Sequence, residues 1–247
     1  QLTNTRVLQP KTDQLSKLTV FIPKENTDTV MEEVYKTGAG KIGDYSKCSF
    51  RVAGTGTFLP DENANPYIGK SGELERVNED RVEFIFPTHI KNDVVGTLKK
   101  VHPYEEVAYY LYDLINESQE VGSGMIGELE KPIGEKEFIH YLKEKMDLKL
   151  VKHTRFLKKE IHRVAVCGGS GSFLLHKAIA RGADIFISAD FKYHEYFDAE
   201  DKIIVADIGH YESEVFTKEL IYELLYKKFP NIALHFSMIN TNPITYT

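Results

Sequence analysis

Three histidines in the sequence stand four residues before a glutamate, a spacing that places both side chains on one face of a helix. An imidazole nitrogen and a carboxylate oxygen together suit zinc, iron or manganese. Spacing alone does not identify a metal site, because nine histidines in a glutamate-rich chain produce such pairs by chance. The three pairs are His102 with Glu106, His140 with Glu144, and His210 with Glu214.

The neighbouring residues distinguish the three pairs from one another. The first precedes a proline, which disfavours a helix there, and the second lies in a charged helical run typical of a solvated pair. His210 and Glu214 instead follow the apolar run "KIIVA" and Gly209, at the predicted start of a helix, where the dipole favours a carboxylate. We therefore take His210 and Glu214 as candidate metal ligands. A helix cap is the alternative, since two ligands make an incomplete site.

Two further loops join predicted strands to predicted helices. The turn in "CGGSGS" matches no P-loop, dinucleotide-binding or nucleophile-elbow motif. Its backbone N–H groups could cradle an anion, and a tight turn without a ligand is the alternative. The candidate anion loop consists of Gly168, Gly169, Ser170, Gly171 and Ser172.

The loop in "ISADFKYHE" places an aspartate and a histidine four residues apart after a predicted strand. Asp190 and His194 could serve as a ligand and a proton carrier, or cap the next helix. We keep His194 as the candidate catalytic residue.

Composition limits the class of protein. The 247 residues, 42% of them hydrophobic, suffice for one large or two ordinary domains. A net charge of −6 without a long basic run makes nucleic acid an unexpected partner. No apolar stretch reaches membrane-spanning length and no leader opens the chain, so we expect a cytoplasmic protein. The two cysteines, Cys48 and Cys167, do not belong to a C-x-x-C motif, which argues against a disulfide framework or a thiolate zinc site.

The first part of the chain predicts a ferredoxin-like domain over residues 17–116. Strands are expected in "KLTVFIP", "CSFRVAGTGTFLP", "LERVNEDRVEFIFP" and "VAYYLYDL", and helices in "TDTVMEEVYKTGAG" and "NDVVGTLKKVHP". Their order is βαββαβ. The polar stretch "INESQEVGSG" marks the expected boundary. Residues 1–16 show no clear strand and are interpreted as a linker or a remnant of a preceding lobe.

The second part, residues 117–247, predicts a mixed α/β layered lobe, so the fold class is α/β (α+β). Strands are expected in "RVAVC", "ADIFISA" and "KIIVAD", and helices in "EKEFIHYLKEKMDL" and "SFLLHKAIARG". One long amphipathic helix is expected in "SEVFTKELIYELLYKKF", with Val215, Leu220, Leu224 and Leu225 on its apolar side. Ligands of such lobes usually bind at the carboxyl ends of the strands.

Three blocks of the second part, "VAVCGGSGS", "GADIFISADFKYHE" and "VADIGHYESE", resemble the carboxyl-terminal lobe of the Nif-three-like (NGG-one-interacting factor three) family, also called the GTP cyclohydrolase I type 2 family. The resemblance covers about 122–247. In the first part, "GAGKIGDYSKCSF", "GTGTF", "IGKSGELERVNEDRVE" and "HPYEE" are similar to the domain inserted in the long bacterial members. That inserted domain is itself similar to CutA and PII proteins, and the likeness covers about 17–114.

The resemblance implies a dinuclear metal centre, to which G-H-Y-x-x-E contributes His210 and Glu214. The family's other ligands, an adjacent pair of histidines and an aspartate, lie in an amino-terminal lobe. This chain contains no His-His sequence, so we expect that lobe to be absent and the site to be incomplete here. The family implies two divalent ions per intact protomer, with zinc preferred and iron or manganese as alternatives. It also implies a homohexameric ring.

Two functions follow as expectations. The first is a metal-dependent hydrolase, a GTP cyclohydrolase 1 type 2 homolog, acting on a nucleotide-like or phosphorylated substrate. The alternative is a non-catalytic regulatory or scaffold ring protein, which senses a small-molecule effector or a metal through its CutA/PII-like domain. Neither function requires a membrane.

Overall fold

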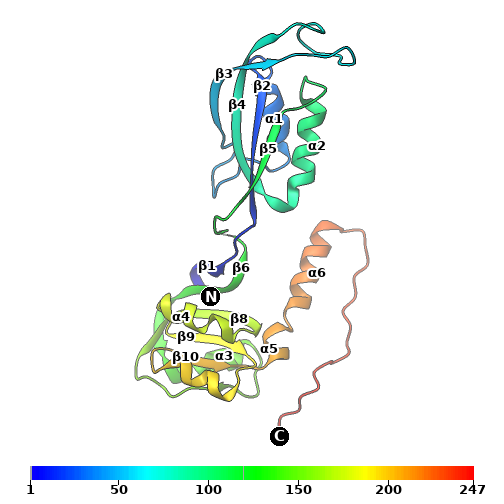
Figure 1. The fold of residues 1–247 in the computed structure, drawn as a ribbon. Helices are drawn as coiled ribbons and strands as arrows, with labels where there is room; N and C mark the ends of the chain where they lie inside the picture. Colours follow the sequence, from blue (N-terminus) through cyan, green and yellow to red (C-terminus); the bar gives the residue numbers. More distant parts are fainter. Residues whose placement is uncertain (1, 119) are drawn as a thin grey trace. The chain divides into compact units, whose positions relative to one another are not determined.

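The computed structural model describes residues 2–118 and 120–247 of the chain. These residues form two compact units. We call residues 11–121 the inserted unit, and 1–10 together with 122–247 the lobe. Figure 1 shows the elements of each unit.

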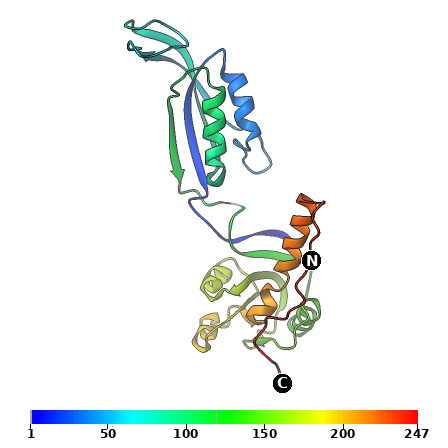
Figure 2. The ribbon, with the colours of Figure 1, turned by 90° about the vertical axis from the view of Figure 1, so that its right-hand side faces the viewer.

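The inserted unit has the predicted βαββαβ order. Its elements are β2 (Leu15–Pro23), α1 (Thr27–Lys36), β3 (Phe50–Phe58), β4 (Glu75–Pro87), η1 (Thr88–Ile90), α2 (Lys91–Val101) and β5 (Tyr109–Leu114). The four strands form an antiparallel sheet in the order β3-β4-β2-β5. The helices α1 and α2 lie side by side along this sheet (Figure 2).

Alternation along the central strands builds the core of the inserted unit. Every second side chain of β2 and β4 is buried against the two helices, because successive residues of a strand point to opposite faces. The pair Leu18 and Phe84, and the pair Val20 and Val82, lie opposite each other in register. The other face of the sheet carries Phe21 and remains open to a cavity described below.

The lobe contains a six-stranded sheet in the order β1-β6-β8-β9-β10-β7. The strands β8, β9 and β10 run parallel to one another, whereas the remaining pairings are antiparallel. The strands are β1 (Leu2–Pro10), β6 (Gly122–Gly134), β7 (Lys152–His153), β8 (Glu160–Ser170), β9 (Ile185–Ala189) and β10 (Ile204–Asp207). The helices are α3 (Glu135–Lys145), η2 (Ser172–Leu174), α4 (Leu175–Ala180), η3 (Tyr193–Ala199), α5 (His210–Glu214) and α6 (Thr217–Lys228).

Both faces of the lobe sheet are covered, so the central strands β9 and β10 are buried along their whole length and consist mostly of apolar residues. On one face, Phe186 and Val205 pack with Leu175 of α4. On the other, Ile185 and Ile204 pack against Phe138 of α3, among other residues. The buried layers hold the carboxyl ends of β8, β9 and β10 in fixed positions at one edge.

The structure corrects the prediction for residues 1–16. Instead of a linker, Leu2–Pro10 forms strand β1, which pairs with β6 so that Pro10 lies opposite Gly122. Strand β2 begins already at Leu15. The segment was missed because β1 is a polar edge strand with only Leu8 fully buried, so it shows no apolar alternation.

The structure also corrects the prediction of one long amphipathic helix near the carboxyl end. The helix is divided into α5 and α6, and α6 has no buried residue. Leu220, Leu224 and Leu225 are exposed, and Val215 lies between the two helices. Apolar periodicity indicates which face of a helix could be buried, but it does not indicate whether another part of the protein packs against that face.

Candidate metal centre

The candidate site lies at the carboxyl edge of the three parallel strands of the lobe. Gly169 lies at the end of β8, Asp190 follows β9, and His210 follows β10 after Gly209. Because neighbouring parallel strands end at the same edge, the loops that follow them meet there. Residues from three separate sequence blocks are therefore brought together.

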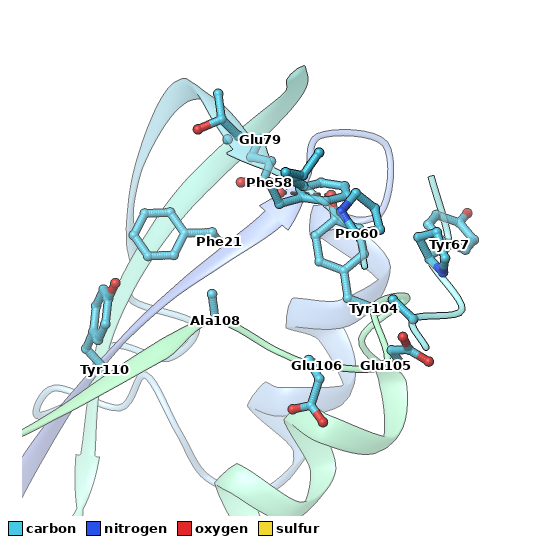
Figure 3. A pocket seen from close by; sticks show the side chains of 15 residues that line it. Phe21, Phe58, Pro60, Tyr67, Glu79, Tyr104, Glu105, Glu106, Ala108 and Tyr110 are labelled. Atoms are coloured by element: carbon cyan, nitrogen blue, oxygen red, sulfur yellow. Dashed lines mark hydrogen bonds between the residues drawn. The ribbon is translucent and has the colours of Figure 1, made fainter. Parts of the chain in front are cut away.

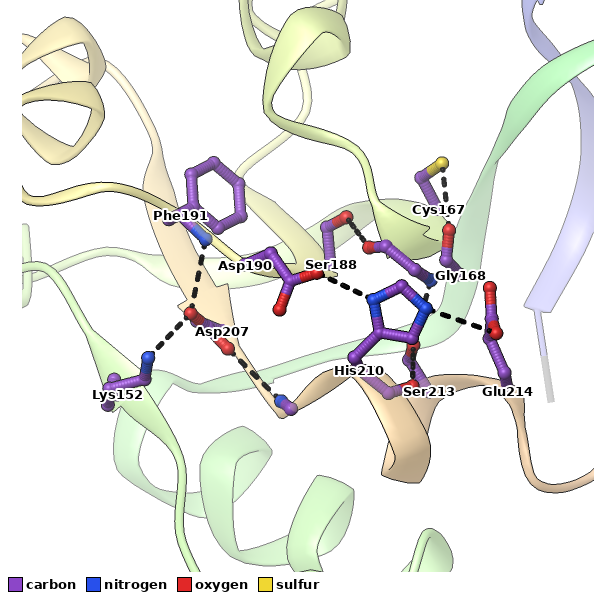
Figure 4. Close-up of polar contacts among 12 residues, drawn as sticks. Lys152, Cys167, Gly168, Ser188, Asp190, Phe191, Asp207, His210, Ser213 and Glu214 are labelled. Atoms are coloured by element: carbon purple, nitrogen blue, oxygen red, sulfur yellow. Dashed lines mark hydrogen bonds and ion pairs between the residues drawn. The ribbon is translucent and has the colours of Figure 1, made fainter. Parts of the chain in front are cut away.

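His210 stands between two carboxylates (Figure 4). Its Nδ1 lies 2.6 Å from Asp190 Oδ2, and its Nε2 lies 3.3 Å from Glu214 Oε2. All three side chains are about half exposed. Asp190 adopts a left-handed backbone conformation with φ of 58°, which aspartate tolerates better than most residues. The loop after β9 thus turns sharply and presents the Asp190 carboxylate to the imidazole.

The two carboxylates set the protonation of His210. The hydrogen bond to Asp190 raises the pKa of His210 above its ordinary value, and the charges of Asp190 and Glu214 add to the shift. A carboxylate can only accept a hydrogen bond, so Nδ1 carries the hydrogen and Nε2 is the nitrogen left for a ligand. A carboxylate on the far nitrogen is the usual orienting partner of a metal-binding histidine.

Gly169 makes room for Glu214. Its φ is +63°, and a Cβ at this position would lie 2.5 Å from Glu214 Oε1. Its N–H donates to Ser213 Oγ at 2.8 Å, and its carbonyl accepts from Ser188 Oγ at 3.0 Å. The glycine-rich turn therefore closes directly beneath the candidate ligands. The sequence presented the loop and the ligands as separate features.

The loop of residues 168–172 uses several of its polar groups internally. Besides the two Gly169 contacts, Ser172 Oγ donates to Glu195 Oε1 at 3.0 Å. A Cβ at Gly171 would overlap Ser188 Oγ. These contacts account for a tight turn, and an anion cradle formed by Gly168, Gly169, Ser170, Gly171 and Ser172 stays a prediction.

Asp207 organises the site and was missed in the sequence. Asp207 is buried, with 2% of its surface exposed. Its Oδ1 accepts the Gly209 N–H at 3.1 Å. Oδ2 accepts from Phe191 N, Tyr196 Oη and Lys152 Nζ at 3.3, 3.1 and 2.8 Å. Asp207 thereby ties the loop after β9 to the turn before His210. An acidic residue ending an apolar strand was the available signal.

His194 is exposed on η3. Within 2–118 and 120–247 it makes no hydrogen bond or ion pair, and its one aromatic contact is with Tyr193. Its assignment as a proton carrier therefore stays a prediction.

Cys167 lies near Glu214, and burial together with the Glu214 charge raises the pKa of its thiol. A raised pKa disfavours the thiolate that a nucleophile or a ligand needs.

The other two His-Glu pairs form no hydrogen bond or ion pair with each other in the part of the chain that the structure describes. His102 is buried, accepts the Tyr104 N–H at Nδ1 at 3.1 Å, and contacts the Phe21 carbonyl through Nε2 at 3.0 Å. His140 and Glu144 are exposed and form no ion pair in the described part of the chain. Of the three pairs, His210 and Glu214 are the one whose side chains form an ion pair within the described residues.

The donors fit a divalent metal in chemical type. An imidazole Nε2 oriented by a carboxylate stands beside a carboxylate oxygen, as in many zinc, iron and manganese sites. No group of three or more histidines, cysteines or acidic residues is arranged to hold an ion within the described ranges. In the described part of the chain, His210 and Glu214 are therefore two candidate ligands, fewer than the four or so that a metal takes.

A hollow of about 770 Å³ opens beside the two candidate ligands. Its walls are largely apolar and come from α5, α6 and the segment 234–244. Ile221 and Leu225 of α6 contribute to it, together with Tyr222. No helix in the described ranges is both long and apolar enough to cross a membrane.

Comparison with known proteins decides the family. The model of Duf34/NIF3 (NGG1p interacting factor 3) matches residues 1–243. The chain belongs to the Duf34/NIF3 family. It is 40% identical over 250 residues to a Halalkalibacterium halodurans protein named "GTP cyclohydrolase 1 type 2 homolog", covering 99% of this chain and 67% of that protein. A Bacillus subtilis protein of the same name is 38% identical, with coverage of 100% and 67%.

A solved Duf34/NIF3 relative has the same fold. The crystal structure of a Bacillus cereus protein related to NIF3 matches with a TM-score of 0.83 and 34% identity. The match covers 100% of this chain and 67% of that protein. The chain thus spans about two thirds of the length of these Duf34/NIF3 relatives. The family resemblance and the mixed α/β fold class that the sequence predicted are confirmed.

Proposed function

We propose that the chain is part of a dinuclear metal-binding hydrolase that acts on a nucleotide-like or phosphorylated substrate. The observation that carries the proposal is the placement of His210 between Asp190 and Glu214, which leaves Nε2 and a carboxylate oxygen side by side. His210 and Glu214 would hold the metal, preferably zinc, with iron or manganese as alternatives. A pair of divalent ions supplies Lewis acidity for hydrolysis. The name of the relatives, "GTP cyclohydrolase 1 type 2 homolog", agrees with this class.

The residues of this chain have defined parts in the proposal. Asp190 orients the imidazole, Gly169 leaves space for Glu214, and Asp207 fixes the turn at Gly209. The apolar hollow beside His210 would receive the uncharged portion of the substrate. Because two ligands are too few, the remaining ligands would come from the additional third of the longer relatives.

Calorimetric titration of the 247-residue chain with zinc tests the proposed ligands. His210→Ala and Glu214→Ala should each weaken zinc binding, whereas Glu144→Ala, which alters the exposed pair on α3, should leave it unchanged. Equal losses from all three substitutions would overturn the assignment. Turnover of GTP and other nucleotides is measured in a protein of the relatives' full length, where His210→Ala should abolish it.

The second candidate is a regulatory or scaffold ring, with six copies and a cytoplasmic location as expected from the sequence. A cavity confined to the inserted unit, lined by residues between Phe21 and Tyr110, favours it. In this function the inserted unit binds a small-molecule effector, and the metal of the lobe is structural. Bound metal without turnover of any nucleotide would favour the ring over the hydrolase.

A further inference from the structure

The inserted unit contains a cavity of about 420 Å³ (Figure 3). It lies on the sheet face opposite to α1 and α2, because Phe21 stands between two residues of β2 that face the helices. This volume is within the usual range for sites that bind small molecules. Five aromatic side chains line the cavity: Phe21, Phe58, Tyr67, Tyr104 and Tyr110.

A buried carboxylate belongs to the same wall. Glu79 is 7% exposed, and Tyr104 Oη donates a hydrogen bond to its Oε1 at 2.8 Å. No other residue in the described ranges donates to this carboxylate, and the lining contains no lysine, arginine or histidine. A buried carboxylate is costly unless a positive charge or several donors compensate it. Within the described residues, Glu79 therefore has one donor and no cationic partner.

Two segments of the sequence, "GTGTF" and "HPYEE", build this wall. A Cβ at Gly56 would overlap the Glu79 carboxylate, so the glycine keeps that space open. Tyr104 is positioned by its N–H, which donates to Nδ1 of the buried His102, and its ring packs edge-on against Phe58 with centroids 5.8 Å apart. Burial and the nearby Glu79 charge raise the pKa of Tyr104, so the phenol keeps its proton and donates.

The rim adds further negative charge. Glu105 and Glu106 both line the cavity. Glu105 Oε1 accepts the Asn65 N–H at 2.8 Å and so holds the loop that carries Tyr67 against the cavity. Three carboxylates without a cationic side chain disfavour an anionic ligand. A bare metal ion is disfavoured too, since no three potential ligands converge in the described part of the chain.

Aromatic faces around a carboxylate recognise an ammonium group, through cation–π attraction and charge pairing. We propose that the cavity of the inserted unit binds a small organic cation, an ammonium group on an apolar body, with Glu79 as its counter-ion. Tyr67 and Tyr104 supply aromatic faces, and Phe58 closes the apolar side. The biological use of the site rests on the second candidate function above, but binding itself is measured without it.

Three compounds of nearly the same shape test the charge requirement: choline, the uncharged 3,3-dimethylbutan-1-ol and the anionic 3,3-dimethylbutanoate. Each is titrated into the ¹⁵N-labelled 247-residue chain, and amide shifts around the cavity give the dissociation constant. Choline should bind about tenfold more tightly than the alcohol, and the anion should not bind. Equal binding of choline and the alcohol, or no choline binding at millimolar concentration, overturns the proposal.

Two variants locate the binding. Glu79→Gln keeps the shape of the side chain and should weaken choline about tenfold, while binding of the alcohol stays unchanged. The control Glu73→Gln removes an exposed carboxylate that does not line the cavity and should change neither. Tyr67→Leu, at a half-exposed position, keeps an apolar side chain but removes the aromatic face, and should weaken choline about threefold or more. Unchanged choline affinity in both Glu79→Gln and Tyr67→Leu overturns the proposal.

These measurements are independent of the metal centre. Zinc binding by the lobe is followed with His210→Ala, which leaves the inserted unit unaltered. Zinc binding that is unchanged in His210→Ala, together with choline binding by the inserted unit, would overturn the proposed metal function alone. Zinc binding that depends on His210, without any choline binding, would overturn the cation site alone.

Discussion

Nδ1 of His210 lies 2.6 Å from Oδ2 of Asp190, although the two residues belong to loops that follow different strands. The contact fixes which nitrogen carries the hydrogen and directs Nε2 toward Glu214. In metal sites, a carboxylate that accepts a hydrogen bond from the far nitrogen of a histidine orients the ring in this way. It links two blocks of sequence that are separated by twenty residues.

Asp190→Asn should lower zinc affinity of the chain by about tenfold or more, because the amide orients the imidazole less strongly and reduces its basicity. Calorimetric titration with zinc measures the change. Asp198→Asn, an exposed residue of the following 3₁₀ helix, is the matched control and should have no effect. An Asp190→Asn variant that binds zinc like the original chain would show that the His210 contact is irrelevant to metal binding.

The same substitution should lower the pKa of His210 in the metal-free chain. The Asp190 hydrogen bond is the largest cause of the raised pKa, so its weakening moves the titration toward the ordinary histidine value. Because the folded-state pKa is raised, the stabilisation from this contact is present below the unfolded pKa of about 6.5 and is lost as pH rises through the folded pKa. Proton NMR of the His210 imidazole measures the pKa in the original chain and in Asp190→Asn.

His102 should give the inserted unit the opposite pH dependence. Burial lowers the pKa of His102, and the neutral ring is needed because Nδ1 accepts the Tyr104 N–H. Stability is therefore present above the unfolded pKa of about 6.5 and is lost as pH falls through the lowered folded pKa. The urea concentration at the midpoint of unfolding, followed by amide signals from β2, should decrease as the pH is lowered from about 8 to about 5.

Substitutions identify the titrating group. His102→Gln removes the acceptor at Nδ1 and should lower stability at about pH 8 by about 1 to 2 kcal/mol, with a flatter pH profile. His89→Gln, at an exposed position of η1, should keep the profile of the original chain. A pH profile unchanged in His102→Gln would assign the dependence to another residue.

Gly169→Ala should destabilise the lobe by about 1 to 2 kcal/mol, since alanine is strained at positive φ. The new Cβ would also press on Glu214 Oε1, so zinc affinity should fall together with stability. Gly134→Ala is the control, because a Cβ there meets nothing within 4 Å. Urea unfolding and zinc titration of both variants test the expectation. Normal zinc affinity in Gly169→Ala would mean that Glu214 does not need this space.

Asp207→Ala should cost about 2 to 4 kcal/mol, because it leaves the N–H groups of Phe191 and Gly209 and the Tyr196 hydroxyl without their acceptor. Asp207→Asn should cost less, since one side-chain oxygen can still accept. Urea unfolding of the two variants measures the difference. Equal costs would indicate that the negative charge facing Lys152 matters more than the hydrogen bonds.

The sequence by itself determined the local features of this protein. Alternating apolar residues and turn signals predicted the βαββαβ order of the inserted unit, since strand and helix periods are properties of short segments. The spacing of His210 and Glu214 predicted one helix face, and α5 places the two side chains in contact. Both features depend on neighbours within a few residues along the chain.

Only the tertiary structure decided which distant segments meet. The pairing of β1 with β6, the contact of Asp190 with His210 and the space that Gly169 leaves for Glu214 depend on sheet order and register. The cavity around Glu79 likewise needs β4 beside β3 and the turn at Tyr104 above them. Residue periodicity does not specify such contacts, because they depend on how the buried faces of separate elements pack against one another.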